Sequence, residues 1–232
     1  CGALHPELMA ETVRKEGADI GLAFDGDGDR LIVCDEKGQI VDGDHIMAIC
    51  AKDLLKQRKL RKKTLVATVM SNMGLEVAME EMGGSLLRTA VGDRYVVESM
   101  RKNGCSFGGE QSGHLVFIDH ITTGDGALAG LQLLSVMRKL DRPLSELASI
   151  MESFPQILKN VRTATRMNIS EIPNFLTTQR KLEEKLDGSG RILVRPSGTE
   201  PVIRVMVEGQ DDALINEMAD ELCELISNAD RM

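Results

Sequence analysis

Three aspartates stand at alternate positions in one short segment of this sequence, Asp25–Arg30, which reads DGDGDR. The two glycines between them let the backbone turn tightly, so the carboxylates of Asp25, Asp27 and Asp29 can converge on one hard cation. Ligands that are all oxygen favour Mg²⁺, Ca²⁺ or Mn²⁺ over Zn²⁺. Carboxylates this close repel one another without a cation. The spacing therefore favours a metal loop over the alternative, an acidic surface turn.

An EF-hand calcium loop is a sharper alternative, because the three aspartates and Glu36 fall on the carboxylate positions of such a loop. The position that requires glycine is Arg30, however, and the flanking segments 18–24 and 31–34 have the apolar character of strands rather than helices. We therefore prefer a metal loop between two strands.

A second group of polar residues lies between glycines in the segment Gly108–His114, which reads GGEQSGH. Glu110, Ser112 and His114 offer a strong acceptor, a hydroxyl and a titratable ring. This combination suits a polyol such as a sugar. A hairpin turn with polar side chains explains the same residues equally well, and the sequence leaves both readings open.

A third segment, Arg195–Pro201, reads RPSGTEP and is followed by Arg204. It supplies two guanidinium groups, two hydroxyls and backbone N–H groups between two predicted strands. Arginine binds phosphate through two parallel hydrogen bonds, so the segment suits a phosphate cradle. It has no Gly-Lys-Ser/Thr and is not a Walker loop. The alternative is a tight turn whose arginines pair with surface acids.

A fourth segment, Val91–Tyr95, reads VGDRY and is the weakest candidate. Gly92 and Asp93 suit the start of the helix that follows as well as they suit a ligand contact. Both readings stay open.

Short apolar runs alternate with longer amphipathic stretches up to about residue 150, and these elements must position the polar segments. The runs predict strands at 18–24, 31–34, 64–70 and 85–87, and the stretches predict helices at 6–16, 44–56, 72–82, 94–102 and 124–140. Pro6 suits a first helical position, Gly17 suits a helix end, and Ser71 is expected to cap the helix that follows it. The alternation predicts an α/β fold with a mixed or mainly parallel sheet and helices on its faces.

The pattern changes near residues 150–154, where we expect a domain boundary. A short helix beginning at Pro143 precedes it, and strands at 154–165, 191–195 and 202–208 and helices at 171–186 and 211–229 follow. This order predicts a smaller α+β C-terminal domain with a mainly antiparallel sheet. The first 40 residues contain too few elements to bury a core alone, and we expect them to be the end of a domain.

Composition excludes several classes of function. The 232 residues are 42% apolar and 28% charged, as in soluble globular proteins, and the net charge of -8 disfavours nucleic acid or an anionic membrane as partner. No apolar run has the length of a membrane span and no signal peptide opens the sequence. Five cysteines form no CxxC pair, which fits a reducing cytoplasm better than a disulfide framework or a zinc site.

Taken together and in this order, the polar segments resemble the α-D-phosphohexomutase superfamily. Asp25–Arg30 resembles its metal loop, Gly109–His114 its sugar-specificity loop and Arg195–Pro201 its phosphate-binding loop. The resemblance covers essentially the whole chain. It implies an enzyme of four domains, in which residues 1–40 are the C-terminal remnant of domain 2, residues 41–150 are domain 3 and residues 151–232 are domain 4.

The resemblance also implies roles for individual residues. Mg²⁺ would be held by Asp25, Asp27 and Asp29, and catalytic roles would fall to Arg30, which neutralises the moving phosphoryl group, and His114, which exchanges a proton. The implied substrate-binding residues are Glu110, Ser112, His114, Arg195, Ser197, Gly198, Thr199 and Arg204. The Ser-His-Asn-Pro segment whose serine carries the phosphoryl group in this family has no counterpart in the sequence. We therefore expect this chain alone to be inactive without the N-terminal domains.

Within the superfamily, Gln111, Gly198 and the segments 68–72 and 91–95 resemble the branch that acts on glucosamine phosphate. This branch interconverts glucosamine 6-phosphate and glucosamine 1-phosphate through a phosphoserine enzyme and a bisphosphate, for amino-sugar nucleotide and cell-wall precursor synthesis. The alternative within the superfamily is the phosphoglucomutase/phosphomannomutase branch. The alternative of another class is a non-catalytic module that binds a metal or a sugar phosphate. A homo-oligomer is compatible with the sequence, and its oligomeric state stays open.

Overall fold

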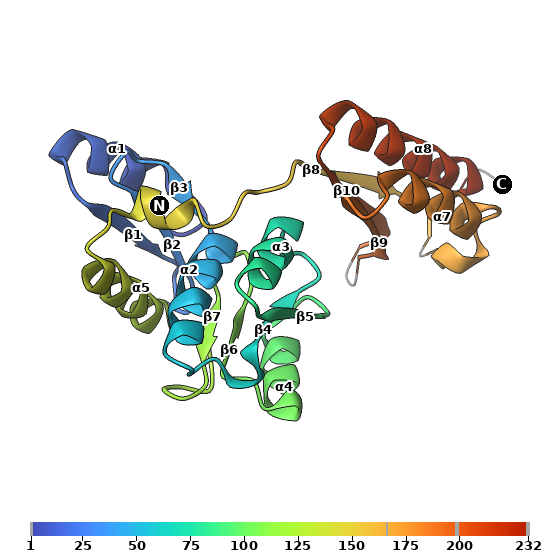
Figure 1. Cartoon of the computed structure of the whole chain (residues 1–232). Helices are drawn as coiled ribbons and strands as arrows, with labels where there is room; N and C mark the ends of the chain where they lie inside the picture. The colour runs from blue at the N-terminus through green and yellow to red at the C-terminus, as the bar shows by residue number, and fades with distance from the viewer. Residues whose placement is uncertain (1, 166, 198–199, 231–232) are drawn as a thin grey trace. The chain divides into compact units, whose positions relative to one another are not determined.

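The computed structural model describes residues 2–165, 167–197 and 200–230, and the chain divides into two compact units. The first unit comprises residues Cys1–Glu152 and the second comprises Ser153–Met232 (Figure 1). Each has its own hydrophobic core. We describe the two units separately.

The first unit begins with a small antiparallel sheet covered by one helix. Helix α1 (Glu7–Glu16) ends at Gly17, which adopts the left-handed conformation with φ 65° that glycine tolerates at a helix end. Strands β1 (Ile20–Phe24), β2 (Leu31–Asp35) and β3 (Ile40–Val41) follow in the sheet order β1-β2-β3, and both pairings are antiparallel. The DGDGDR segment is thus the turn of the β1–β2 hairpin.

The rest of the first unit is a four-stranded sheet in the order β5-β4-β6-β7. Strands β4 (Thr64–Thr68), β5 (Ser85–Thr89) and β6 (Phe107–Gly109) are parallel, and β7 (Leu115–Phe117) runs antiparallel to β6. The helices of this part are α2 (Gly43–Lys56), α3 (Met73–Glu81), α4 (Asp93–Asn103), α5 (Gly126–Leu140) and the short α6 (Leu144–Ala148), with a 3₁₀ turn at Arg61–Lys63.

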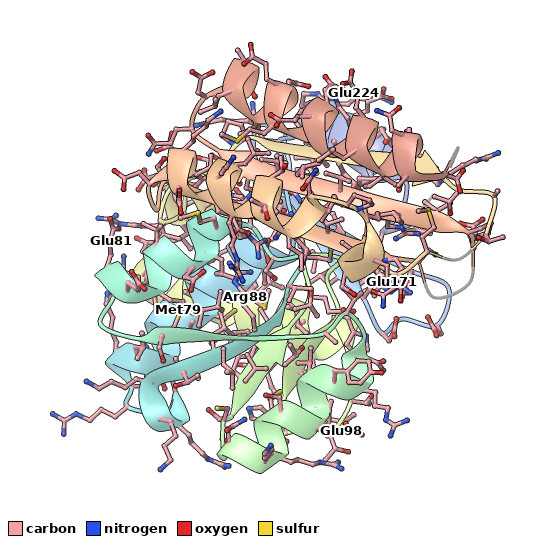
Figure 2. All side chains as sticks on the ribbon, turned by 90° about the vertical axis from the view of Figure 1, so that its right-hand side faces the viewer. Met79, Glu81, Arg88, Glu98, Glu171 and Glu224 are labelled. Atoms are coloured by element: carbon pink, nitrogen blue, oxygen red, sulfur yellow. The ribbon has the colours of Figure 1, made fainter. Side chains whose placement is uncertain are left out.

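The central strand β4 is buried on both faces, because its alternate side chains enter two different cores. Leu65 and Ala67 pack with residues of α2, α3 and α5 in the main core, whereas Val66 packs with Val96 and Met100 of α4. Glu98, on the outer side of α4, projects away from the unit (Figure 2). The segments Val91–Tyr95 and Gly108–His114 therefore leave a sheet that is covered by helices on both faces, whereas the DGDGDR segment leaves the small sheet of β1–β3.

The second unit is a three-stranded antiparallel sheet covered by two helices. Strands β8 (Gln156–Arg162), β9 (Gly190–Pro196) and β10 (Val202–Gly209) have the order β8-β10-β9. A 3₁₀ turn at Ile169–Glu171 precedes α7 (Phe175–Leu186), and α8 (Asp212–Asp230) ends the described part. Alternate residues of β10, among them Val205 and Val207, pack with both helices in one core, and Glu224 projects from the outer side of α8 (Figure 2).

The predicted fold class is confirmed: an α/β part with a mixed sheet is followed by an α+β part with an antiparallel sheet. Of the two predicted alternatives, a mixed sheet or a mainly parallel one, the second is wrong for β1, β2 and β3, which form an antiparallel meander. Prediction missed the two-residue β3 and the three-residue β6 and β7. Strands this short carry too little alternation to be recognised.

The predicted helix cap at Ser71 is also wrong. Asn72 caps α3, because its side-chain oxygen accepts a hydrogen bond from the Gly74 N–H at 2.9 Å. Ser71 is instead fully buried beside Asp44, whose carboxylate accepts the Asn72 N–H at 2.7 Å. Pro6 is the residue before the first helical position rather than the first position itself. Among the helices of the described residues, none combines the length and apolar character that crossing a bilayer requires.

Candidate functional site

The DGDGDR turn brings three carboxylates together. It joins β1 to β2, and Gly28 supplies a positive φ of 74° inside it. One carboxylate oxygen each of Asp25, Asp27 and Asp29 lies within 4.8 Å of the other two. The predicted convergence of the three side chains is therefore present in the structure.

Arg30 compensates part of the negative charge in this turn. Its Nε lies 3.2 Å from Asp25 Oδ2 and 3.8 Å from Asp29 Oδ1, and its backbone N–H donates to Asp25 Oδ1 at 3.1 Å. Burial works to raise the pKa of Asp25, but the hydrogen bonds from the Arg30 N–H and from Asp29, together with the guanidinium charge, hold the pKa below its ordinary value.

Asp29 lies in a different environment. Burial and the neighbouring Asp25 carboxyl raise the pKa of Asp29 above its ordinary value. Its Oδ1 is buried and accepts no hydrogen bond within the described residues, because Arg30 Nε, 3.8 Å away, is beyond hydrogen-bond distance. A buried carboxylate oxygen without a donor is costly unless a cation lies beside it. Together with the all-oxygen donor set, this oxygen makes the turn fit a hard divalent cation.

The segment after Gly109 is the turn of the β6–β7 hairpin. The Glu110 N–H donates to the His114 carbonyl at 2.9 Å, and the Gly113 N–H donates to the Glu110 carbonyl at 3.0 Å. Gly113 has φ 91°, and a Cβ there would lie 2.1 Å from the Leu31 carbonyl oxygen. The turn therefore needs glycine at this position, both for the conformation and for the close approach to β2.

This close approach joins the two turns. The Leu31 N–H donates to the Gly113 carbonyl at 3.0 Å, and Arg30 forms an isolated antiparallel bridge with His114. The predicted metal loop and the predicted sugar loop, about 85 residues apart in sequence, are thus neighbours through their backbones. Both are built from hairpins, so the turn reading and the ligand-loop reading of Gly108–His114 are compatible.

The imidazole of His114 lies at the centre of this contact. It is buried, with 4% of the residue exposed. Nδ1 lies 3.0 Å from Asp29 Oδ2, and Nε2 accepts the backbone N–H of Gly124 at 3.1 Å. Because Nε2 accepts, the ring proton is on Nδ1 and is donated to Asp29. Both ring nitrogens are therefore engaged within the protein, and Gly124 is a residue of the site that sequence patterns did not indicate.

Glu110 is held by the segment that was the weakest sequence candidate. The Gly92 N–H donates to Glu110 Oε1 at 3.0 Å. Gly92 precedes the first residue of α4, has φ 128° and offers no side-chain cap. Asp93 is the first helical residue. The segment Val91–Tyr95 thus starts the helix and also fixes one oxygen of Glu110.

The turn of the β6–β7 hairpin is called the sugar turn below. Its other two polar side chains, Gln111 and Ser112, differ in exposure and in contacts. Gln111 Nε2 donates to Asp42 Oδ2 at 3.3 Å, and Asp42 is the N-cap residue of α2. The Gly43 N–H also donates to the Gln111 carbonyl at 3.0 Å. Ser112 is exposed. Glu110 and Ser112 therefore remain the side chains that can meet a sugar hydroxyl, with Gln111 tied to the start of α2.

The predicted phosphate segment lies in the second unit, between β9 and β10. Arg195 and Arg204 are directly opposite each other in the antiparallel register of these strands. Burial lowers the pKa of Arg195, and the nearby charge of Arg204 adds to the effect. The Ser197 N–H donates to the Val202 carbonyl at 2.7 Å, which closes the turn. Gly198 and Thr199 lie outside the described residues.

Comparison with known families identifies the class of protein that this fold and site define. Models of three domains of the phosphoglucomutase/phosphomannomutase family match the chain: the α/β/α domain II over residues 5–38, the α/β/α domain III over residues 42–154 and the C-terminal domain over residues 158–225. The chain therefore belongs to the phosphoglucomutase/phosphomannomutase family.

The curated relatives that match this chain include phosphoglucosamine mutases. The phosphoglucosamine mutase of Desulfotalea psychrophila is 72% identical over 97% of this chain and 50% of the relative. The phosphoglucosamine mutase of Pelobacter propionicus is 57% identical over the same shares of the two chains. The chain thus spans about half the length of the curated relatives that it matches.

Solved structures share the fold. A phosphoglucomutase/phosphomannomutase family protein of Burkholderia thailandensis superposes with a TM-score of 0.76 at 25% identity, covering 98% of this chain and 50% of that one. Aspergillus fumigatus N-acetylphosphoglucosamine mutase, solved with GlcNAc-6P and magnesium, superposes with a TM-score of 0.76 at 20% identity, covering 97% and 56%. At this identity the second comparison supports the fold alone.

Proposed function

We propose that this chain provides the metal-binding, sugar-binding and one phosphate-binding part of a phosphoglucosamine mutase, which interconverts glucosamine 6-phosphate and glucosamine 1-phosphate. The observation that carries the proposal is the joining of the DGDGDR turn to the sugar turn through the bridge between Arg30 and His114. The names and identities of the curated relatives support the choice of an amino sugar.

In this proposal Asp25, Asp27 and Asp29 hold Mg²⁺. The ion, when bound, stabilises negative charge on the oxygens of the phosphoryl group in transfer. The proposal assigns Arg30 to balancing charge at the same place, because its guanidinium lies within 3.8 Å of two of these carboxylates. The Aspergillus enzyme, which shares this fold, was itself solved with magnesium.

The sugar is assigned to Glu110 and Ser112, which hold its hydroxyl groups. An acid–base role for His114 stays a prediction and requires that its ring give up a hydrogen bond to Asp29 or Gly124. The buried ring supports a positioning role better, in which His114 fixes the orientation of Asp29.

The phosphate that does not react is assigned to Arg195 and Arg204, with Ser197 and the turn residues Gly198 and Thr199. Arg195 and Arg204 lie directly opposite each other on neighbouring strands and supply two guanidinium groups, the donors with which arginine binds phosphate. The phosphorylated serine that begins the reaction is assigned to a part of the enzyme outside these 232 residues, and a sugar bisphosphate is the intermediate.

The proposal also includes the division of the chain into three parts and its compartment. Residues 1–40 belong to domain II, residues 41–150 to domain III and residues 151–232 to domain IV, and the ranges of the family matches support this division. We place the enzyme in the cytoplasm, for which the free cysteines Cys34, Cys50, Cys105 and Cys223 are support.

The experiment is a comparison of substrates with the full-length enzyme that contains these residues. We expect kcat/KM to be highest for glucosamine phosphate, with glucose phosphate and mannose phosphate as competitors. A preference for mannose or glucose phosphate would move the protein to the phosphoglucomutase/phosphomannomutase branch. Complete inactivity on all three sugar phosphates, with Mg²⁺ and the matching bisphosphate present, would favour a non-catalytic binding module.

A further inference from the structure

A cavity of about 470 Å³ lies in the second unit beside the predicted phosphate turn, and most of its walls come from residues that the sequence patterns did not indicate. Two of them, Asn160 and Arg162, belong to β8, one strand away from the turn. The complete lining is Asn160, Arg162, Thr163, Glu200, Pro201, Val202 and Arg204. Arg204 is thus shared between this cavity and the predicted phosphate site.

The register of the sheet shows how β8 reaches the phosphate turn. Arg204 of the central strand lies opposite Arg195 of β9 on one side and opposite Asn160 of β8 on the other. Arg162 lies opposite Val202, one diagonal step from Arg204. Diagonal neighbours on one face of an antiparallel pair are about 7–8 Å apart, within reach of two arginine side chains. Arg162, Arg204 and Arg195 therefore share one face of the sheet.

The end of β8 is also fixed to the turn itself. The Thr163 N–H donates to the Pro201 carbonyl at 3.0 Å, and Thr163 is buried. A backbone hydrogen bond next to Arg162 therefore holds the end of β8 beside Pro201.

Ion pairing distinguishes Arg162 and Arg204 from two other cations of this sheet, Lys159 of β8 and Arg191 of β9. Lys159 Nζ lies 2.7 Å from Asp220, and Arg191 pairs with the buried Glu208. For Arg162 and Arg204, no ion pair is present within the described residues. Like charges on neighbouring strands destabilise a sheet, and a bound anion offsets this cost. Glu200 is the one acid among the lining residues.

We propose that Asn160 and Arg162 form a second wall of the phosphate site, so that a sugar phosphate monoester is bound in this cavity by Arg162 of β8 together with Arg204 of β10. The inference rests on the proposed function and deepens it. It assigns to β8 a direct contact with the phosphate group that the turn segment alone does not provide.

The test is a titration of the ¹⁵N-labelled 232-residue chain, followed by NMR, with inorganic phosphate and with glucosamine 6-phosphate as separate probes. Variants are Arg162→Gln, Arg162→Lys, Arg195→Gln and, as a matched control, Arg180→Gln on the exposed surface of α7. We expect Arg162→Gln to raise the Kd of both probes about tenfold, the effect of losing one charge-assisted contact. Arg162→Lys should fall between this variant and the wild type, and Arg180→Gln should match the wild type.

The outcomes separate the inference from the proposed function. If Arg195→Gln weakens binding while Arg162→Gln behaves like Arg180→Gln, the second wall is wrong and the phosphate turn stands. If Arg162→Gln weakens glucosamine 6-phosphate but not inorganic phosphate, the contact is with the sugar and the phosphate assignment is wrong. If the wild type binds neither probe, both the inference and the phosphate part of the proposed function are overturned. The same conclusion follows if neither Arg162→Gln nor Arg195→Gln changes the Kd. The same spectra report whether each variant is folded. If Arg162→Gln does not fold, the Kd of Arg162→Lys is compared with that of the wild type instead.

Discussion

Nδ1 of His114 lies 3.0 Å from Oδ2 of Asp29, and the same ring accepts the Gly124 N–H through Nε2. This arrangement orients one candidate metal ligand from the side of the sugar turn. It gives a physical link between the proposed metal turn and the proposed sugar turn.

The first prediction concerns this pair. Replacing His114 with Leu should weaken Mg²⁺ binding about tenfold or more, because partners of metal ligands typically contribute 10–100-fold to affinity. Replacing it with Asn should preserve most of the affinity, since the Asn amide can donate from nearly the position of Nδ1. Mg²⁺ affinity is measured by calorimetry on variants whose circular dichroism matches the wild type. Equal affinities for the Leu variant and the wild type would show that His114 does not position Asp29.

The second prediction concerns the metal turn. Mg²⁺ should raise the Tm of the wild-type chain, because a ligand that binds the folded state stabilises it by mass action. Asp27→Asn removes one of the three converging carboxylates and should reduce this shift strongly. Asp19→Asn, at an exposed position before β1, is the control and should respond as the wild type does. If the two variants respond alike, the cation site is not in this turn.

The third prediction concerns Gly92 and Glu110. A residue with Cβ disfavours φ 128°, so Gly92→Ala should displace the N–H that holds Glu110 Oε1. In the full-length enzyme we expect kcat/KM for glucosamine phosphate to fall about tenfold, the effect of one misplaced contact.

The matched control for that variant is Gly104→Ala at the opposite end of α4, where φ is also positive at 69° and a Cβ would have nothing within 4 Å. Both changes strain the backbone, but only Gly92 contacts Glu110. A similar loss of activity in the two variants would mean that stability, and not the position of Glu110, explains the effect.

The fourth prediction concerns Asp44, which is buried at the start of α2. Burial and the charge of Asp42 raise its pKa to about 7, against the hydrogen bond from the Asn72 N–H, the neighbouring Ser71 hydroxyl and the charge of Arg88. The side chain of Arg88 is labelled in Figure 2 and donates to the Ser71 carbonyl at 2.7 Å.

A carboxyl with a raised folded-state pKa binds more protons in the folded than in the unfolded chain between these two pKa values. Its contribution to the free energy of unfolding is therefore complete below about pH 4 and is lost as the pH rises through about 7. Asp44→Asn should remove this loss. The free energy of unfolding of the variant, relative to that of the wild type, should therefore rise by a few kcal/mol between pH 4 and 8, at about 1.4 kcal/mol for each pKa unit. Urea unfolding at several pH values measures it. A pH-independent difference between the two proteins would contradict the raised pKa.

Most of the elements could be predicted from the sequence, because amphipathic stretches such as those of α1, α2 and α8 are long enough to show their period. Strand partners could not. The alternation of strands and helices indicated a parallel sheet, yet β1 and β2 pair as a hairpin because only the short DGDGDR turn separates them. Asn72 rather than Ser71 caps α3, since Ser71 is drawn into the buried polar group around Asp44.

The sequence by itself determined which residue types stand together in each loop, because the three carboxylates of one turn and the two glycines between them are local features. Only the tertiary structure decided which loops meet. Asp29 and His114 are 85 residues apart, and their contact depends on how β2 packs against the β6–β7 turn, where glycine at position 113 allows the backbones to touch. The same is true of Arg162, which reaches the phosphate turn through strand pairing across a sheet. Chemistry that is local in sequence can be read from the residues, whereas contacts between distant segments are set by packing and register.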